Sequence, residues 1–135
     1  MDKRHFLFAA ACLLLTGCAT YHISTQSLVQ QFADTQPEKK YTIVVAFPFF
    51  IPFSVNGNSL QTLKVLDKDG KETVIPVTNR TSVRITRNDS SRTTFYFNTL
   101  LIQDSTITGS KTHFFEAHIK PMKLKDIAKI EVQKD

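Results

Sequence analysis

Short runs in which apolar and polar residues alternate, separated by turn-forming residues, restrict the fold of this chain more than any other feature. Val83 and Ile85, for example, alternate with Arg84 and Thr86, and a period of two residues is typical of a strand with one buried face. The pattern predicts a mainly β fold, a single small antiparallel sandwich or barrel-like domain. Strands are expected at residues 41–47, 60–66, 73–77, 82–87, 93–97, 100–103, 106–108 and 114–119, with turns at 69–70, 88–91, 104–105 and 109–110.

The end of the chain continues this series. We expect a helical turn at residues 126–129 and then a last strand, with Leu124, Ile127, Ile130 and Val132 facing the core. Pro76 has no N–H group to donate to a neighbouring strand, so it should lie at a sheet edge or at the end of its strand.

The first 17 residues have the pattern of an export signal. Asp2, Lys3 and Arg4 precede an apolar run at residues 6–15, about the length of the apolar region of a signal peptide. A helix that crosses a bilayer needs roughly 20 apolar residues, and this run is shorter. We therefore interpret residues 1–17 as a signal peptide that is removed.

This segment ends at Leu15-Thr16-Gly17-Cys18, which resembles the lipobox of bacterial lipoproteins at every position. The resemblance implies that Leu15, Thr16 and Gly17 are recognised during processing and that Cys18 becomes the first residue. It also implies a diacylglyceryl group on the Cys18 thiol and an N-acyl chain such as palmitate, which together form a membrane anchor. The alternative is that Cys18 merely ends an uncleaved membrane helix.

The residues after Cys18 bear on localisation. Residue 19 is Ala, not the Asp that holds enterobacterial lipoproteins at the inner membrane, so the resemblance implies the outer membrane. No acidic cluster follows Cys18, which favours the periplasmic face of the cell envelope. The other cysteine, Cys12, lies in the signal segment, so the mature chain should contain no disulfide. No cofactor is expected beyond the covalent lipid.

Residues 18–40 are expected to be a lipidated N-terminus and tether that precedes a β-rich domain at residues 41–135. Ser24 or Thr25 can cap a short helix whose apolar residues Leu28, Val29 and Phe32 share one face, before Pro37 interrupts it. This helix is either a docking helix or a tether packed loosely on the domain.

The last third of the chain, residues 95–132, resembles uncharacterised small lipoproteins of the Bacteroidota type. The similar segments are the aromatic strand at 94–97, the Asp-Ser hairpin at 101–109 and the ending at 124–132. The resemblance implies no activity.

An unusually apolar segment with two prolines occupies residues 46–53. We define the apolar lip as Phe47, Phe49, Phe50, Ile51 and Phe53. Pro48 and Pro52 remove backbone donors, so the segment should not form a regular central strand. It is either an exposed lip that meets a membrane, a lipid or a partner protein, or a buried loop that plugs the end of the core.

Other candidate sites are weak. His113 and His118 lie five residues apart, which on a strand places them on opposite faces, so we expect no metal. The chain has no Gly-x-Ser-x-Gly motif, and Asp104 and Glu116 are too isolated to form a carboxylate pair. Net charge is +5. The densest basic stretch of the chain contains Arg80, Arg84, Arg87 and Arg92. These arginines either meet an anionic surface or lie at solvated strand ends.

These observations predict a lipid-anchored cell-envelope protein that is not an enzyme. The leading hypothesis is a binding or structural module facing the periplasm, which contacts an envelope protein through a sheet face or the apolar lip. The alternatives are a small-ligand or lipid-binding carrier, and an immunity or inhibitor protein. An envelope location excludes nucleic acid as a partner.

Overall fold

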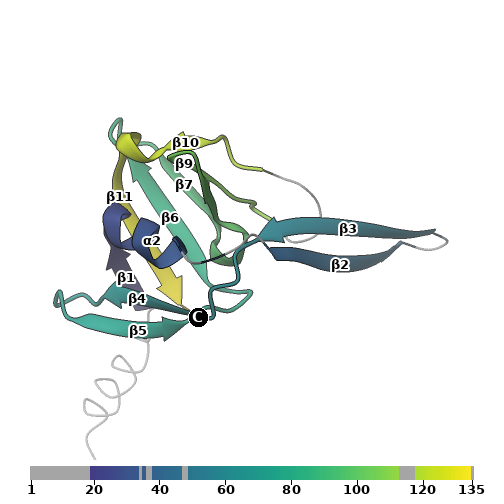
Figure 1. The fold of residues 1–135 in the computed structure, drawn as a ribbon, viewed down its shortest axis with the longest axis horizontal. Coiled ribbons are helices and arrows are strands. Elements are labelled where there is room, and N and C mark those ends of the chain that lie inside the picture. The colour runs from purple at the N-terminus through teal and green to yellow at the C-terminus, as the bar shows by residue number, and fades with distance from the viewer. Residues whose placement is uncertain (1–18, 34, 36–37, 47–48, 113–117, 135) are drawn as a thin grey trace, which may run out of the picture.

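The computed structural model describes residues 19–33, 35, 38–46, 49–112 and 118–134. These residues form a mainly β fold in which every strand pairs antiparallel with its neighbours, which confirms the predicted fold class. Figure 1 shows one large sheet, a smaller sheet beside it and a separate two-stranded ribbon.

The large sheet has six strands in the order β5-β4-β1-β11-β6-β7. Its N-terminal and C-terminal strands, β1 and β11, are central neighbours, and Ala19 pairs with Lys134 at one end of the pair. Pro76 is the last residue of the edge strand β5, as predicted. The strands are β1 (Ala19–Ile23), β4 (Thr62–Leu66), β5 (Glu72–Pro76), β6 (Ser82–Arg87), β7 (Arg92–Tyr96) and β11 (Ile127–Lys134).

The position of β1 corrects the expectation that residues 19–40 are a tether outside the domain. Ala19–Ile23 pairs along its whole length with β11 and bridges to β4 through His22 and Leu66. The physical reason is visible in the sequence: Tyr21 and Ile23 alternate with Thr20 and His22, a short strand pattern. Ala19 is therefore already part of the sheet.

The predicted short helix is present as α2 (Thr25–Phe32). Ser24 is its N-cap, and the Ser24 hydroxyl accepts a hydrogen bond of 3.1 Å from the Ser27 N–H. Leu28 and Phe32 are buried, so this is a docking helix within the core. Its Gln31 side chain bonds both backbone groups of Lys64, at 2.8 and 3.0 Å, and so pairs with β4 beyond the end of β1.

One face of the large sheet carries the core. The buried residues at alternate positions include Val83 and Ile85 of β6 with Ile130 and Val132 of β11. Over this face lie α2, the 3-10 helix η2 (Phe97–Thr99) and a small sheet in the order β10-β9-β8. Its strands are β8 (Leu101–Gln103), β9 (Thr106–Thr108) and β10 (Met122–Lys123).

Two local features set the register of these layers. Asp104 and Ser105 both have positive φ, 50° and 59°, as required in a two-residue hairpin turn between β8 and β9. In β11 the pairing with β6 shifts between Ile127 and Lys129. This bulge lets Ile127 and Ile130 both pack against the core although they are three residues apart. The helical turn expected at 126–129 is instead η3 (Leu124–Asp126).

The ribbon consists of β2 (Glu38–Ala46) and β3 (Phe49–Gly57), paired from Glu38↔Gly57 to Ala46↔Phe49. The segment expected as a lip or loop is therefore mostly strand. Pro52 is tolerated because a two-stranded ribbon has no central strand. Phe47 and Pro48 lie outside the described residues, as do residues 114–117 of the strand expected at 114–119.

Candidate functional site

The best candidate site is the second face of the six-stranded sheet, which we call the open face. Antiparallel partners share a face, so the pairing assigns one set of residues to it. Among the described residues no helix or strand packs over this set, most of which is exposed or half-buried. The residues are Thr20 and His22; Thr62, Lys64 and Leu66; Glu72, Val74 and Pro76; Ser82, Arg84 and Thr86; Arg92, Thr94 and Tyr96; and Lys129, Glu131 and Gln133.

Two large apolar side chains interrupt the polar surface near its β5 edge. Leu66 is 41% exposed and Val74 is 56% exposed. They are diagonal neighbours on adjacent strands, since Leu66 pairs with Glu72 and Val74 pairs with Lys64. Exposed Pro76 follows on the same face of β5. Neighbouring apolar side chains on an open sheet face are typical of a surface that contacts another molecule.

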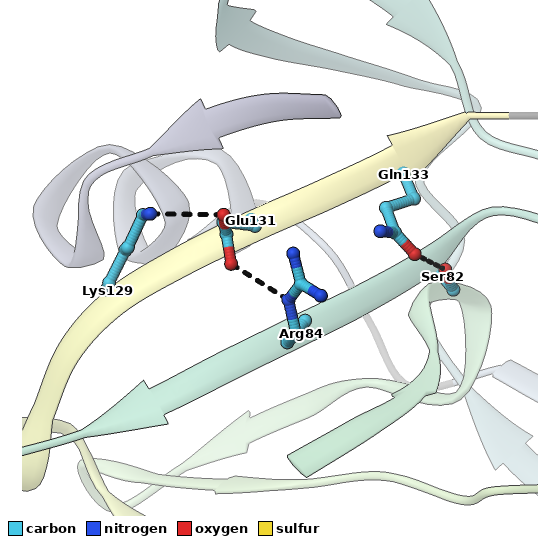
Figure 2. Close-up of polar contacts among 5 residues, drawn as sticks. All are labelled: Ser82, Arg84, Lys129, Glu131 and Gln133. Carbon is cyan, nitrogen blue, oxygen red and sulfur yellow. Dashed lines mark hydrogen bonds and ion pairs between the residues drawn. The ribbon is translucent and has the colours of Figure 1, made fainter. Parts of the chain in front are cut away.

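A buried carboxylate lies at the centre of the open face. Glu131 has only 11% of its side chain exposed, yet the strand register assigns it to the open face. Figure 2 shows why: Arg84 Nε lies 2.9 Å from Glu131 Oε2, and Lys129 Nζ lies 3.1 Å from Oε1. The flanking cations neutralise and shield the carboxylate. Beside them the Ser82 hydroxyl donates a hydrogen bond of 3.4 Å to Gln133.

These contacts decide the chemistry available to Glu131. The hydrogen bond from Arg84 is the largest cause that lowers the pKa of Glu131, and Lys129 adds to it, while burial acts in the opposite direction. A carboxyl group with a lowered pKa is ionised at neutral pH and has no proton to donate. Glu131 therefore fits a structural ion pair that orders the face.

This ion pair predicts an acid-sensitive contribution to stability. Because folding lowers the pKa of Glu131 below its ordinary value of 4.5, its contribution is fully present above that value and disappears as pH falls through the lower folded-state pKa. We expect Glu131→Gln to cost about 1 kcal/mol at neutral pH. The variant should also lose less stability than the unmodified protein between about pH 6 and about pH 3.

Urea denaturation at both pH values measures this difference. Asp89→Asn is the matched variant for a carboxyl group outside the ion pair. Hydrogen bonds from the Ser91 hydroxyl and backbone N–H also lower the pKa of Asp89, but Asp89 lies at an exposed turn. If Glu131→Gln followed the pH dependence of the unmodified protein, the ion pair would not contribute to acid sensitivity.

A cavity of about 490 Å³ opens beside the sheet, between α2 and β4. His22 and Leu66, through which β1 and β4 pair, both line this cavity. Its volume is within the usual range for small-ligand sites. The lining is mostly polar: His22, Ile23, Ser24, Ser27, Gln30, Gln31, Lys64, Val65, Leu66 and Glu72.

The structure brings few of the predicted site residues together. The lipobox residues Leu15, Thr16, Gly17 and Cys18, and Phe47 of the apolar lip, lie outside the described residues. The other lip residues, Phe49, Phe50, Ile51 and Phe53, lie on β3. The open face was foreseen only as "a sheet face". The alternation of polar and apolar residues in β6 and β11 indicates which of their residues belong to the open face. Which residues of other strands lie beside them depends on the strand order, which the alternation does not give.

The histidines and arginines are dispersed. His22 lies in β1, exposed His118 bridges to Ser110, and His113 lies outside the described residues. Within the described ranges no three His, Cys, Asp or Glu residues gather in a way that could hold a metal. Of the arginines, Arg84 binds Glu131, Arg87 donates a hydrogen bond to Ser91, and Arg80 and Arg92 are exposed.

The part of the chain that the structure describes contains no helix long and apolar enough to cross a membrane. No protein-family model, curated protein or solved structure matches the chain.

Proposed function

We propose that this protein is a lipid-anchored, non-enzymatic binding module of the bacterial cell envelope, at the periplasmic face of the outer membrane. The anchor is the lipid on Cys18 that the lipobox resemblance implies. Because β1 starts at Ala19, this lipid would be attached to the sheet without a spacer. The domain would therefore stay close to the membrane surface, and so would its partner.

The single observation that carries the binding role is the open face with its exposed Leu66 and Val74. A binding surface of this kind combines an apolar centre with polar surroundings that fix orientation. Here the apolar pair lies toward the β5 edge, and Arg84, Lys129 and Glu131 supply a preformed polar group at the centre of the same face. Both carboxylate oxygens of Glu131 are occupied by Arg84 and Lys129, which fits a binding role better than acid–base catalysis.

Photo-crosslinking in cells tests this role. A benzoylphenylalanine residue in place of Val74 should give one discrete crosslinked product, and the further change Leu66→Asp should remove it. The control position is Lys120, which is exposed but not on the open face. A crosslinked product from Lys120 alone, or one from Val74 that Leu66→Asp leaves unchanged, would contradict binding through the open face.

A further inference from the structure

The β2–β3 ribbon changes from polar to apolar along its length. Nearest the domain, Glu38, Lys39 and Lys40 pair with Gly57, Asn56 and Val55. Farther out, from Ile43↔Pro52 to Ala46↔Phe49, all eight paired residues are apolar. We call these residues, 43–46 and 49–52, the apolar end of the ribbon. Thr42↔Phe53 and Tyr41↔Ser54 lie between the two regions.

The apolar end is directed away from the rest of the protein. In Figure 1 the ribbon extends from the side of the domain, and its far end lies well beyond the two sheets. The connection to the domain is at the other end, where β3 meets η2 and the Asn58 N–H donates a hydrogen bond of 3.0 Å to the Asn98 carbonyl. The ribbon therefore joins the domain at the end opposite to the apolar end.

The register also shows that the apolar end differs from an ordinary amphipathic strand pair. Successive residues of a strand belong to opposite faces, and here consecutive residues of both strands are apolar. Apolar residue types are therefore assigned to both faces of the ribbon. A partner protein that packed on one face would leave the other uncovered, whereas a lipid phase surrounds the ribbon on all sides.

The backbone limits how deeply such a ribbon can enter lipid. Two paired strands leave an unpaired outer edge on each strand, and open edges are not tolerated in the hydrocarbon core. They are tolerated at the boundary between headgroups and acyl chains, where water remains and apolar elements bury about 5–10 Å. From the first to the last of the four apolar pairs the backbone spans about 10 Å at ~3.3 Å per residue, which is within this shallow depth. Pro52 also removes one backbone donor.

We propose that the apolar end of the ribbon inserts into the headgroup–acyl boundary of a phospholipid bilayer, as a second membrane contact besides the lipid on Cys18. Lys39 and Lys40 lie three to four residues before Ile43, about 10 Å along the strand. They are thus placed at the level of the lipid phosphates, which attract basic residues. The inference rests on the proposed function in one respect: the bilayer is taken to be the membrane that holds the Cys18 lipid.

Tryptophan fluorescence tests this insertion, because the chain contains no Trp. Phe50→Trp introduces a single reporter at the apolar end, and Val45→Trp places one at its paired position. The full chain, purified from membranes, is incorporated into phospholipid vesicles whose acyl chains carry bromine either near the headgroup or near the bilayer centre. Both reporters should show blue-shifted emission, quenched several-fold more by the shallow bromines than by the deep ones.

Two matched variants give the comparison. Tyr41→Trp, nearer the base of the ribbon, should be quenched less than Phe50→Trp, and Tyr96→Trp on the open face should not be quenched. Weak quenching of Phe50→Trp and Val45→Trp would overturn the proposal, as would stronger quenching by the deep bromines. Blue-shifted emission without bromine quenching would also overturn it, since the reporter would then be buried against protein, either this chain or a second copy of it.

The same vesicles separate this proposal from the proposed anchor. Unquenched Phe50→Trp in a protein that sediments with vesicles and carries lipid on Cys18 refutes insertion and leaves the anchor intact. Quenched Phe50→Trp in a protein whose Cys18 carries no lipid supports insertion and refutes the anchor.

Discussion

Replacing Phe97 with Ala is expected to lower the free energy of unfolding by about 3–5 kcal/mol. The Phe97 side chain is fully buried, and its ring meets that of Phe32 edge to face, with centroids 6.0 Å apart and an interplanar angle of 69°. The substitution removes this contact and leaves a cavity between η2 and α2. A loss of this size is a large fraction of the stability of a small domain, about 5–15 kcal/mol.

The position of Phe97 makes the effect extend beyond one side chain. Its backbone carbonyl accepts a hydrogen bond of 2.8 Å from the Asn58 side chain, which also donates to the Leu100 carbonyl at 3.0 Å. Asn58 directly follows β3. Phe97 therefore joins α2, the small sheet and the base of the ribbon in one core, and amide exchange in α2 should accelerate in Phe97→Ala.

Urea unfolding followed by circular dichroism measures the loss. Leu66→Ala is the matched control, because Leu66 is 41% exposed and its truncation should change stability by about 0.5 kcal/mol or less. A cost of Phe97→Ala as small as that of the control would show that η2 does not organise the core.

The sequence allowed much of the large sheet to be predicted, for a physical reason. In β6, residues 82–87 alternate strictly and end at a turn, so the strand bounds match the expectation. The inward positions of Ile130 and Val132 were also predicted correctly. The pattern is strong there because one face is buried and the other is open, which is the case that a two-residue period describes.

Strand β1 was missed because its alternation covers only five residues, directly after the predicted signal peptide. Its central position comes from pairing with β11, more than 100 residues away, and local sequence does not encode such pairing. The Glu131 ion pair was missed for the same reason. Glu131 lies opposite Arg84 only through the β11–β6 register, and neither residue stands out in its own strand.

The apolar lip was recognised from composition, but its conformation was not. Prolines at positions 48 and 52 indicated that a central strand was excluded, which holds in the structure. A two-stranded ribbon satisfies this condition as well as a loop does. The long pairing from Glu38↔Gly57 outward decides between them.

The second large effect concerns the anchor. Cys18→Ser should abolish lipid attachment completely, because serine has no thiol to form the thioether that the lipobox resemblance implies. Since cleavage follows this modification in the lipobox pathway, the variant should also keep residues 1–17. Intact mass spectrometry of the purified variant should give the unprocessed chain of 135 residues.

A serine variant of Cys12 is the matched control for the loss of a thiol. Cys12 lies within the apolar run of the signal segment, and Cys12→Ser should be cleaved and acylated like the unmodified protein. Cleaved and acylated product in the Cys18→Ser preparation, as in the Cys12→Ser preparation, would contradict the assigned role of Cys18.

In the proposed function, the sheet is attached to lipid directly at its first strand, β1. The mass of the N-terminal peptide of the protein purified from membranes tests this attachment. We expect a peptide that starts at Cys18 and carries a diacylglyceryl group and an amide-linked acyl chain. A peptide that starts at Met1, or an unmodified Cys18 at any N-terminus, would contradict it.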